Sequence, residues 1–264
     1  MKVVFLTGSH PRHAFMARSI AASGALVGLV IEQREAFIPE APLDIAPKIR
    51  EMFRHHFTFR DAAEARHFGG SVLPDRVCRN VTMAELNTPE TISFINGLKP
   101  DLILSYGVHK LTAETLGGIT CKRQWNIHGG LSPWYRGVTT HFWPSYFLEP
   151  QMTGMTIHEL TQAIDGGALI HQSVAEMVRG DGLHDLACRA VSALGNEMPA
   201  LLRAVSQGEV KAPHTQGTTG RIWRSADWRP EHLHLIYEVY GDRIVDRYLD
   251  GEFLRTEPKL FRQF

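Results

Sequence analysis

The sequence predicts an α/β protein with a mostly parallel, twisted sheet that is covered by helices on both faces. Short apolar runs that end in glycine or turn residues indicate strands buried on both sides, and the first is "KVVFLTG" at residues 2–8. Segments with apolar residues at helical spacing alternate with these runs. The 264 residues, 44% of them hydrophobic, are enough for one large core.

The first elements form a strand, helix and second strand. After residues 2–8 we expect a helix over 11–24, with Pro11 in its first turn and Gly24 at its end, and then the strand "ALVGLVIE" at 25–32. The charged segment 46–68 indicates another helix. A further helix is expected over 88–98, where Thr88 is the predicted N-cap and Pro100 ends the helix.

The middle of the chain continues the alternation. Strands are expected at 101–107, 124–128, 153–161 and 168–177, with short helices at 111–118 and 140–148. Apolar residues at helical spacing predict a long helix from Leu183 to Val205, which Pro199 should kink or split.

The character of the sequence changes after Gly208. Residues 211–230 are rich in turn formers, and 231–254 indicate one helix and a short strand pair. Residues 209–264 are too few for a confident second core. We therefore predict a main domain over 1–208 and a C-terminal extension over 209–264 that packs on it.

Charge and cysteine content restrict the class of protein. Lys plus Arg and Asp plus Glu number 28 each, so no overall field favours nucleic acid or an anionic membrane. Cys78, Cys121 and Cys188 are few and widely spaced, as expected of reduced thiols. The first apolar run is too short for a secretory leader. We expect a cytoplasmic protein without nucleic-acid or membrane partners.

Several polar residues fall at the predicted strand ends, where open α/β sheets bind ligands. These are Ser105, Asn126, His128 and Asp165. Asn126 and His128 are two residues apart, so their side chains share one face of a strand. An amide can donate to a developing oxyanion, and a histidine oriented by a carboxylate can accept a proton, which together suit acyl transfer to an amine.

Other chemistries find less support. No Gly-x-Ser-x-Gly motif or activated cysteine indicates a covalent nucleophile. The histidine pairs 55–56 and 232–234 lack companions at ligand spacing, so we predict no metal. A single histidine in a strand, such as His128, is more often structural. The combination of His128 with Asn126 and Asp165 instead favours a catalytic role. The loop "SHPRH" at 9–13 is expected either to bind a phosphate or to be a solvated loop.

The segments "NIHGGLSPWYRG" (126–137) and "TGMTIHELTQAIDGGALIHQ" (153–172) resemble the folate-dependent formyltransferase family. That family includes glycinamide ribonucleotide, methionyl-tRNA and sugar N-formyltransferases, and the resemblance extends from residue 1 to about 208. It implies a Rossmann-like formyltransferase fold over the main domain, which would be the catalytic domain. It also implies that Asn126, His128 and Asp165 are catalytic and that 10-formyltetrahydrofolate is the formyl donor.

The resemblance also implies the substrate contacts. Folate would lie against the strand end and loop that contain Leu104, Ser105, Tyr106, Gly107, Val108, Leu160 and Ile164. The acceptor amine would contact Ser9, His10, Arg12, Tyr135, Arg136 and Thr140. The chain departs from the usual Ser-Leu-Leu-Pro of the family at Gly130 and Ser132, which puts the conformation of this loop in question.

The sequence leaves the identity of the acceptor amine open. We expect an amino sugar carried on a nucleotide, with a hydroxyornithine-like amine or glycinamide ribonucleotide as alternatives. Methionyl-tRNA is disfavoured because the chain has no net positive charge. A formyltetrahydrofolate hydrolase and a non-catalytic folate-binding module are the rival classes. The aromatic residues of the extension are compatible with a homodimer interface or with simple packing on the core.

Overall fold

The computed structural model describes residues 1–33, 40–217, 220–254 and 256–264, and in them the main sheet has seven strands. Their order is β3-β2-β1-β4-β5-β7-β8. The strands are β1 (Val3–Thr7), β2 (Leu26–Glu32), β3 (Val77–Val81), β4 (Leu102–Tyr106), β5 (Arg123–His128), β7 (Gly154–Glu159) and β8 (Leu169–Val174).

Five of these strands are parallel, and the last two are not. β1 pairs in parallel with β2 and β4, β2 with β3, and β4 with β5. β7 is antiparallel to β5, and β8 is antiparallel to β7. The prediction of a mostly parallel α/β sheet is confirmed. The carboxyl ends of β1, β4 and β5 therefore lie together at one edge of the sheet.

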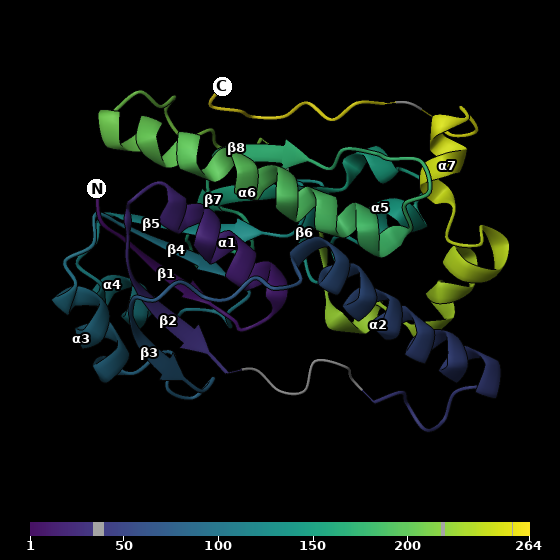
Figure 1. Ribbon diagram of the computed structural model, residues 1–264, viewed down its shortest axis with the longest axis horizontal. Helices are drawn as coiled ribbons and strands as arrows, with labels where there is room; N and C mark the ends of the chain where they lie inside the picture. Colours follow the sequence, from purple (N-terminus) through teal and green to yellow (C-terminus); the bar gives the residue numbers. More distant parts are fainter. Residues whose placement is uncertain (34–39, 218–219, 255) are drawn as a thin grey trace.

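Helices cover both faces of the sheet (Figure 1). Helices α1 (Pro11–Ala22), α2 (Pro47–Phe68) and α6 (Leu183–Gln207) pack on one another. They form a core with alternate β1 residues Val3 and Phe5. Helices α3 (Pro89–Gly97) and α4 (Ala113–Gly118) lie over the opposite face, where Val4 and Leu6 point. Each β1 residue is thus buried on one side or the other, as its continuous apolar run predicts.

The structure differs from the expected elements in several places, and the unpredicted elements include the short strands β6 (Tyr135–Gly137) and β9 (Arg221–Trp223). β3 was not predicted, because its sequence "VCRNV" is mostly exposed at the edge of the sheet and lacks an apolar run. Pro199 does not split α6, which continues from Leu183 to Gln207. Within the described part of 231–254, short helical turns and α7 (Ile244–Leu249) replace the expected strand pair, so that prediction was wrong.

The C-terminal extension contacts the main domain at two strands, β6 and β8. Its strand β9 (Arg221–Trp223) pairs in parallel with β6 (Tyr135–Gly137), which precedes the short helix α5 (Trp143–Tyr146). The last residues run beside β8, where Phe261 O accepts a hydrogen bond from the Gln172 backbone N–H over 2.9 Å (Figure 1). The extension therefore covers the free edge of β8.

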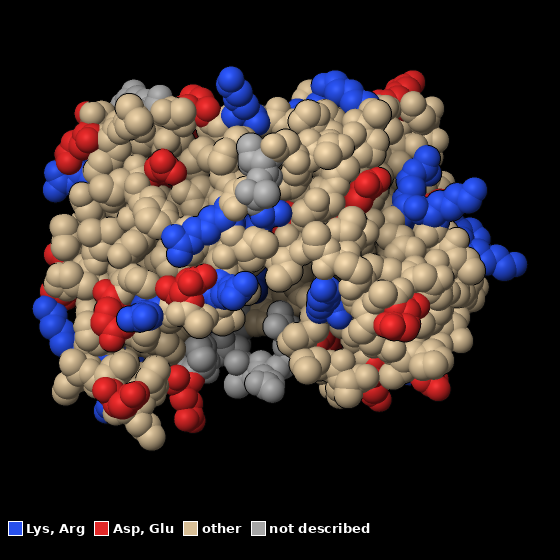
Figure 2. Space-filling view, turned by 180° about the vertical axis from the view of Figure 1, so that it is seen from behind, with Lys and Arg blue, Asp and Glu red and all other residues tan. Residues whose placement is uncertain are grey.

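Surface charge is mixed. Figure 2 shows Lys and Arg side chains interspersed with Asp and Glu on the face opposite to that in Figure 1, in keeping with the equal numbers of the two signs. In the part of the chain that the structure describes, no helix combines the length and apolar character needed to cross a bilayer.

Candidate active site

The candidate site lies where β4 and β5 end. The parallel pairing sets Ser105 beside Asn126, and Ser105 Oγ donates a hydrogen bond of 2.7 Å to Asn126 Oδ1. Because this bond occupies the amide oxygen, the amide nitrogen of Asn126 is the group that can donate to another partner.

Asp165 connects the two imidazoles of the site. Its Oδ2 lies 3.5 Å from His128 Nδ1, and its Oδ1 lies 3.3 Å from His158 Nε2. His158 stands opposite Asn126 in the antiparallel pair of β5 and β7, and its Nε2 is 3.3 Å from the Asn126 amide nitrogen. The fold thus brings Asn126, His128 and Asp165 together, with His158 as a fourth member.

His128 lies behind this group. Its side chain is 7% exposed, and its Nε2 lies 2.8 Å from the carbonyl oxygen of Tyr135. Since a carbonyl oxygen can only accept, Nε2 carries the proton in the neutral ring, and Nδ1 presents its lone pair toward Asp165. A proton that reaches His128 would therefore bind Nδ1, where the carboxylate stabilises it.

The electrostatics of the pair follow from burial and charge. Burial lowers the pKa of His128, and the Asp165 carboxylate opposes this shift only in part. Burial raises the pKa of Asp165, but His128, His158 and the Gly137 N–H outweigh that effect and bring the pKa to about 2. At neutral pH the site thus holds an ionised carboxylate beside a neutral His128, an arrangement suited to accepting a proton.

The loop of Asp165 is held from two sides. The Gly137 N–H donates to Asp165 Oδ2 over 2.8 Å, and Gln216 Nε2 donates to the backbone oxygens of Asp165 and Gly167 over 2.8 and 2.7 Å. Asp165 has a φ of 44°, in the left-handed region that aspartate tolerates better than most residues. The carboxylate is therefore presented by a specific loop conformation that the extension helps to fix.

The two departures from the family motif fit this geometry. A Cβ atom at Gly130 would lie 2.8 Å from His128 Nε2 and 2.5 Å from Tyr135 O, so the hydrogen bond between these groups needs a glycine there. Ser132 is fully buried, and its hydroxyl donates to Asp165 O over 3.4 Å. One departure leaves room for His128, and the other contacts the Asp165 loop.

A cavity of about 290 Å³ opens beside Asn126, His158 and Asp165, and we call it the smaller cavity. Four residues predicted to contact folate line it: Ser105, Val108, Leu160 and Ile164. Tyr106 and Gly107 instead line a second cavity. Leu104 is fully buried in the core, so only its backbone is available for the predicted folate contact.

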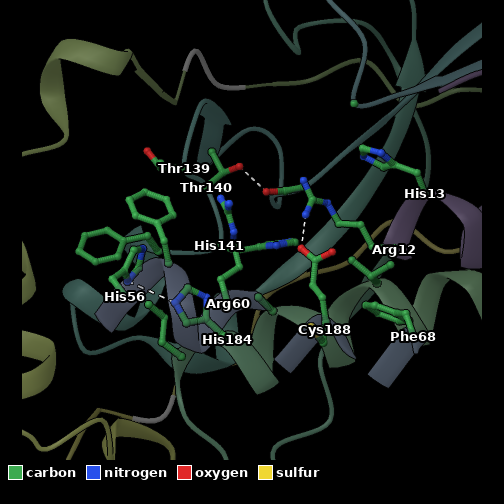
Figure 3. Close-up of a pocket in the computed structure, with 18 of the residues that line it drawn as sticks. Arg12, His13, His56, Arg60, Phe68, Thr139, Thr140, His141, His184 and Cys188 are labelled. Carbon is green, nitrogen blue, oxygen red and sulfur yellow. Dashed lines mark hydrogen bonds and ion pairs between the residues drawn. The ribbon is translucent and has the colours of Figure 1, made fainter. Parts of the chain in front are cut away.

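The second, larger cavity of about 370 Å³ lies on the other side of the same strand ends. Its walls come from α1, α2, α6, the loop 139–142 and the extension. Figure 3 shows the side chains of Arg12 and Arg60 reaching toward its centre from different sides, near Thr140 and His141. Arg12 and Thr140 are the two predicted acceptor contacts that line it.

The other four predicted acceptor contacts do not line either cavity. These residues are Ser9, His10, Tyr135 and Arg136. The Tyr135 ring is buried and its hydroxyl donates to Glu149 Oε2 over 2.8 Å. Arg136 is 8% exposed. The expected clamp of Tyr135 and Arg136 therefore lies inside the protein, in the strand β6 that pairs with β9.

Three of the histidines that line the larger cavity are neutral at physiological pH. His184 Nε2 lies 3.2 Å from His56 Nδ1, which is 2.8 Å from the Tyr237 hydroxyl. Burial lowers the pKa of His56 to about 3 and that of His141 to about 4, and it places the pKa of His184 well below the usual value. These rings act as neutral hydrogen-bonding groups.

Among the polar residues of the two cavities that sequence reasoning missed, three stand out. His158 is a polar residue near the end of the buried strand β7, shortly before the Asp165 loop, which is the signal that could have singled it out. Arg60 and Glu64 come from α2, whose many exposed charges conceal the two that point inward. In the described ranges, no cluster of three or more His, Cys, Asp or Glu side chains is placed to hold a metal ion.

The chain is similar in sequence to part of a larger curated protein. A curated relative, the bifunctional polymyxin resistance protein ArnA of Wigglesworthia glossinidia brevipalpis, is 30% identical over 122 residues. The match covers 45% of this chain but only 18% of that relative, so the chain corresponds to a small part of it.

Three solved structures share the fold. A sugar N-formyltransferase from Shewanella sp. has a TM-score of 0.56 at 14% identity, covering 89% of this chain and 87% of its own. Phosphoribosylglycinamide formyltransferase from Anaplasma phagocytophilum also scores 0.56, at 18% identity and with coverage of 85% and 98%. The formyltransferase PseJ from Anoxybacillus kamchatkensis scores 0.52 at 15% identity, with coverage of 92% and 95%, and was solved with a UDP-linked formamido sugar and tetrahydrofolate.

The sequence profile of the formyl transferase family matches residues 54–202, which include β4, β5, β7 and every residue of the group around Asp165. This match spans more than half of the chain. The protein therefore belongs to the formyl transferase family.

Proposed function

We propose that the protein moves the formyl group of 10-formyltetrahydrofolate to a primary amine, and that this amine belongs to an amino sugar linked to a nucleotide. The observation that carries the proposal is the ionised carboxylate of Asp165 between His128 and His158, next to the Asn126 amide at the wall of a cavity. This combination offers a hydrogen-bond donor and a proton acceptor at one place.

Each group has a role in the proposed reaction. The amine nitrogen attacks the formyl carbon, and the Asn126 amide N–H donates to the carbonyl oxygen as negative charge develops there. The bond between the formyl carbon and N10 of the folate then breaks. The amine loses one proton and N10 gains one, so the products are a formamide and tetrahydrofolate.

Asp165 and the histidines would carry that proton. Asp165 lines the smaller cavity with His158, whereas His128 is buried on its far side. We infer that Asp165 and His158 meet the reacting atoms, and that His128 supports Asp165 by accepting charge through Nδ1. Under this proposal His128 is a proton-relay and orienting residue that acts through the carboxylate.

The smaller cavity suits the folate. Apolar side chains of Val108, Leu111, Leu160 and Ile164 can pack against a flat heteroaromatic ring, while Asn126 and Asp165 provide polar partners. The larger cavity suits the acceptor, because it combines hydroxyl and neutral imidazole groups with aromatic side chains. PseJ, which shares the fold, was solved with a UDP-linked formamido sugar, and this supports an amino-sugar nucleotide as the acceptor.

An acceptor screen tests the proposal directly. The purified protein would be incubated with 10-formyltetrahydrofolate and, in separate reactions, with amino-sugar nucleotides, hydroxyornithine, glycinamide ribonucleotide or no amine. Mass spectrometry would report the added formyl group. Formylation of an amino-sugar nucleotide is the expected result. Folate turnover without any amine would indicate a hydrolase, and binding without turnover would indicate a non-catalytic module.

Substitution of Asn126 tests the assigned roles. Asn126→Ala removes the donor to the oxyanion and should lower kcat by roughly 100-fold, with little change in the KM of the folate. Asn80→Ala, on the exposed edge strand β3, is the matched control and should retain full activity. Full activity of Asn126→Ala would show that this amide is not the oxyanion donor.

A further inference from the structure

We propose that Gln172, on β8, is a positioning residue for formyl transfer, because it joins the docked C-terminal segment (residues 256–264) to the loop 129–134 between β5 and β6. This inference rests on the proposed function, since that function gives His128 and Asp165 their roles. Gln172 lines neither the smaller nor the larger cavity. Its effect on the reaction would therefore pass through the backbone of the loop.

The side-chain amide of Gln172 is buried, and each of its polar atoms has a partner. The residue is 0% exposed. Its Nε2 donates to Ser132 O over 2.7 Å and to Thr156 Oγ1 over 3.2 Å. Its Oε1 accepts from the Phe261 backbone N–H over 3.0 Å. The side chain thus bridges the C-terminal segment and the loop 129–134.

These partners fix the orientation of the amide. Ser132 O can only accept, so it must face the NH₂ group, and the Phe261 N–H can only donate, so it must face the oxygen. The Gln172 backbone N–H also donates to Phe261 O over 2.9 Å, which keeps Phe261 beside the side chain. A carboxylate of the same shape would set an oxygen against Ser132 O. Glutamine, and not glutamate, therefore suits this position.

Thr156 extends the contact along the loop. Its Oγ1 donates to Gly130 O over 2.7 Å and accepts from the Ser132 backbone N–H over 3.0 Å. With the bond from Gln172, these contacts use the one donor and both lone pairs of the hydroxyl. Thr156 is fully buried and stands opposite His128 in β5 and Gln172 in β8. The neighbouring strands β7 and β8 therefore hold the loop backbone at Gly130 and Ser132.

The same two loop residues meet the candidate active site. Ser132 Oγ donates to Asp165 O over 3.4 Å, and a Cβ at Gly130 would lie 2.8 Å from His128 Nε2. A displacement of about 1 Å is enough to slow a reaction in a preorganised site. Loss of the Gln172 contacts should therefore misplace His128 and Asp165 and lower the rate of the chemical step.

Further contacts hold the C-terminal segment beside β8, where it runs along the edge of the sheet (Figure 1). The Gln263 backbone N–H donates to His171 Nδ1 over 3.1 Å. Arg262 forms an ion pair with Glu197 of α6. The Gln172 amide has its backbone donor only while this segment is docked, so docking and the conformation of the loop are linked.

Hydrogen exchange tests this link without turnover. Gln172→Met keeps the side-chain length and removes the amide. Mass spectrometry would follow the peptide 129–137, whose amides include the hydrogen-bonded N–H groups of Ser132 and Gly137. We expect its exchange to be about tenfold faster in Gln172→Met, while peptides of α3, on the other face of the sheet, keep their rate. Unchanged exchange of 129–137, or equal acceleration in α3, would overturn the proposal.

Ser173→Ala is the matched control. Ser173 is the next residue in β8 and is 1% exposed. Among the residues that the structure describes, its hydroxyl has no hydrogen-bond partner. The substitution therefore changes a buried polar side chain of the same strand without breaking a link to the loop. It should leave the exchange of 129–137 and the kcat unchanged.

Substitution of Phe261 reaches the same hydrogen bond from the C-terminal segment. Phe261→Pro removes the N–H that Gln172 accepts, whereas Phe261→Ala loses the ring and keeps the N–H. We expect kcat to fall about tenfold in Phe261→Pro and in Gln172→Met, with the KM of both substrates unchanged, and to stay near the wild-type value in Phe261→Ala. The double variant should be no slower than Gln172→Met. Multiplied effects, or a raised KM with unchanged kcat, would contradict the proposal.

The two experiments separate this inference from the proposed function. If the wild type formylated no amine of the acceptor screen, the proposed function would be refuted, and the exchange rates would still decide whether Gln172 holds the loop. If the wild type transferred the formyl group and Gln172→Met did so at the same kcat, only the role of Gln172 would be refuted.

Discussion

The position of one proton on His128 decides what the residues around Asp165 can do. Because Nε2 donates to the Tyr135 carbonyl, the nitrogen that can gain a proton is Nδ1, and it faces the carboxylate. If the proton were on Nδ1 instead, the lone pair of Nε2 would face the Tyr135 carbonyl oxygen, and the two would repel. The backbone of Tyr135 therefore selects the protonation state that a relay through Asp165 requires.

Gly130 makes this hydrogen bond possible, and its replacement should show that. In Gly130→Ala the new methyl group would meet His128 Nε2 and Tyr135 O, so the imidazole must shift from its position beside Asp165. We expect kcat to fall by about 10- to 100-fold, because a displacement near 1 Å costs that much in a preorganised site. Steady-state kinetics would measure the change.

Gly117→Ala is the matched control, since a Cβ at that position meets nothing within 4 Å. It should keep both activity and stability. If Gly130→Ala retained the wild-type kcat, the contact of His128 with Tyr135 would not matter for the reaction.

Single residues were predictable where they form a pattern. Asn126, His128 and Asp165 stand at strand ends, and the parallel sheet brings such ends together without any further information. His158 was missed because a single histidine in a strand resembles a buried structural one. Its importance depends on the register that places it opposite Asn126, and that register is a property of the folded sheet.

At the scale of elements, helix α6 links the core to the larger cavity. Its buried face packs on α1 and α2, and its first turns supply His184 and Cys188 to the cavity wall. The helix starts at Leu183, whose backbone N–H donates to Asp242 Oδ1 over 2.8 Å. A side chain from the extension thus satisfies a donor at the start of the helix.

Asp242 makes the start of α6 sensitive to pH. Burial raises the pKa of Asp242 to about 6, only partly offset by the Leu183 N–H. Since this folded value lies above the ordinary 3.8, ionisation opposes folding, and stability is lost as the pH rises through about 6. Asp242→Asn keeps the acceptor oxygen and cannot ionise. It should raise the free energy of unfolding at pH 7 by about 1–2 kcal/mol after screening is allowed for.

Urea unfolding at pH 7 and at pH 4 would measure this difference. The variant and the wild type should have similar stability at pH 4, where both side chains are largely uncharged. A constant difference at both pH values would show that the substitution acts through packing and not through ionisation.

Elements were predictable where apolar residues are continuous. β1, β2 and β4 are buried on both faces and read clearly as strands. β3 has only Val81 buried, so its place in the sheet comes from pairing with β2 and not from its own sequence. The strand pair expected within 231–254 was wrong because apolar residues of this segment pack in one cluster with residues of α2 and α5, a contact between distant segments that local patterns do not reveal.

At the scale of the molecule, the extension lines the larger cavity and supports the wall of the smaller one. Trp228 lines the larger cavity, and Gln216 holds the loop that carries Asp165 at the smaller one. The predicted boundary near Gly208 remains a proposal about how the chain divides. The contacts nevertheless give residues 209–264 a direct part in shaping the candidate site.

Gln216 offers a test of that part. Gln216→Ala removes the hydrogen bonds to the backbone oxygens of Asp165 and Gly167, so the loop should sample positions in which the carboxylate is displaced. We expect a kcat about tenfold lower with little change in thermal stability. Gln207→Ala, exposed at the end of α6, is the control. An unchanged kcat in Gln216→Ala would mean that the loop keeps its position without the extension.

The separation of the two cavities has a consequence for the order of events. They have no lining residue in common, although Tyr106 and Gly107 on one side are chain neighbours of Ser105 and Val108 on the other. A ligand can therefore bind in either cavity while the other cavity is empty. Under the proposed function, the kinetics should follow a random-order sequential scheme, and an inert analogue of either substrate should compete only with the substrate that it resembles.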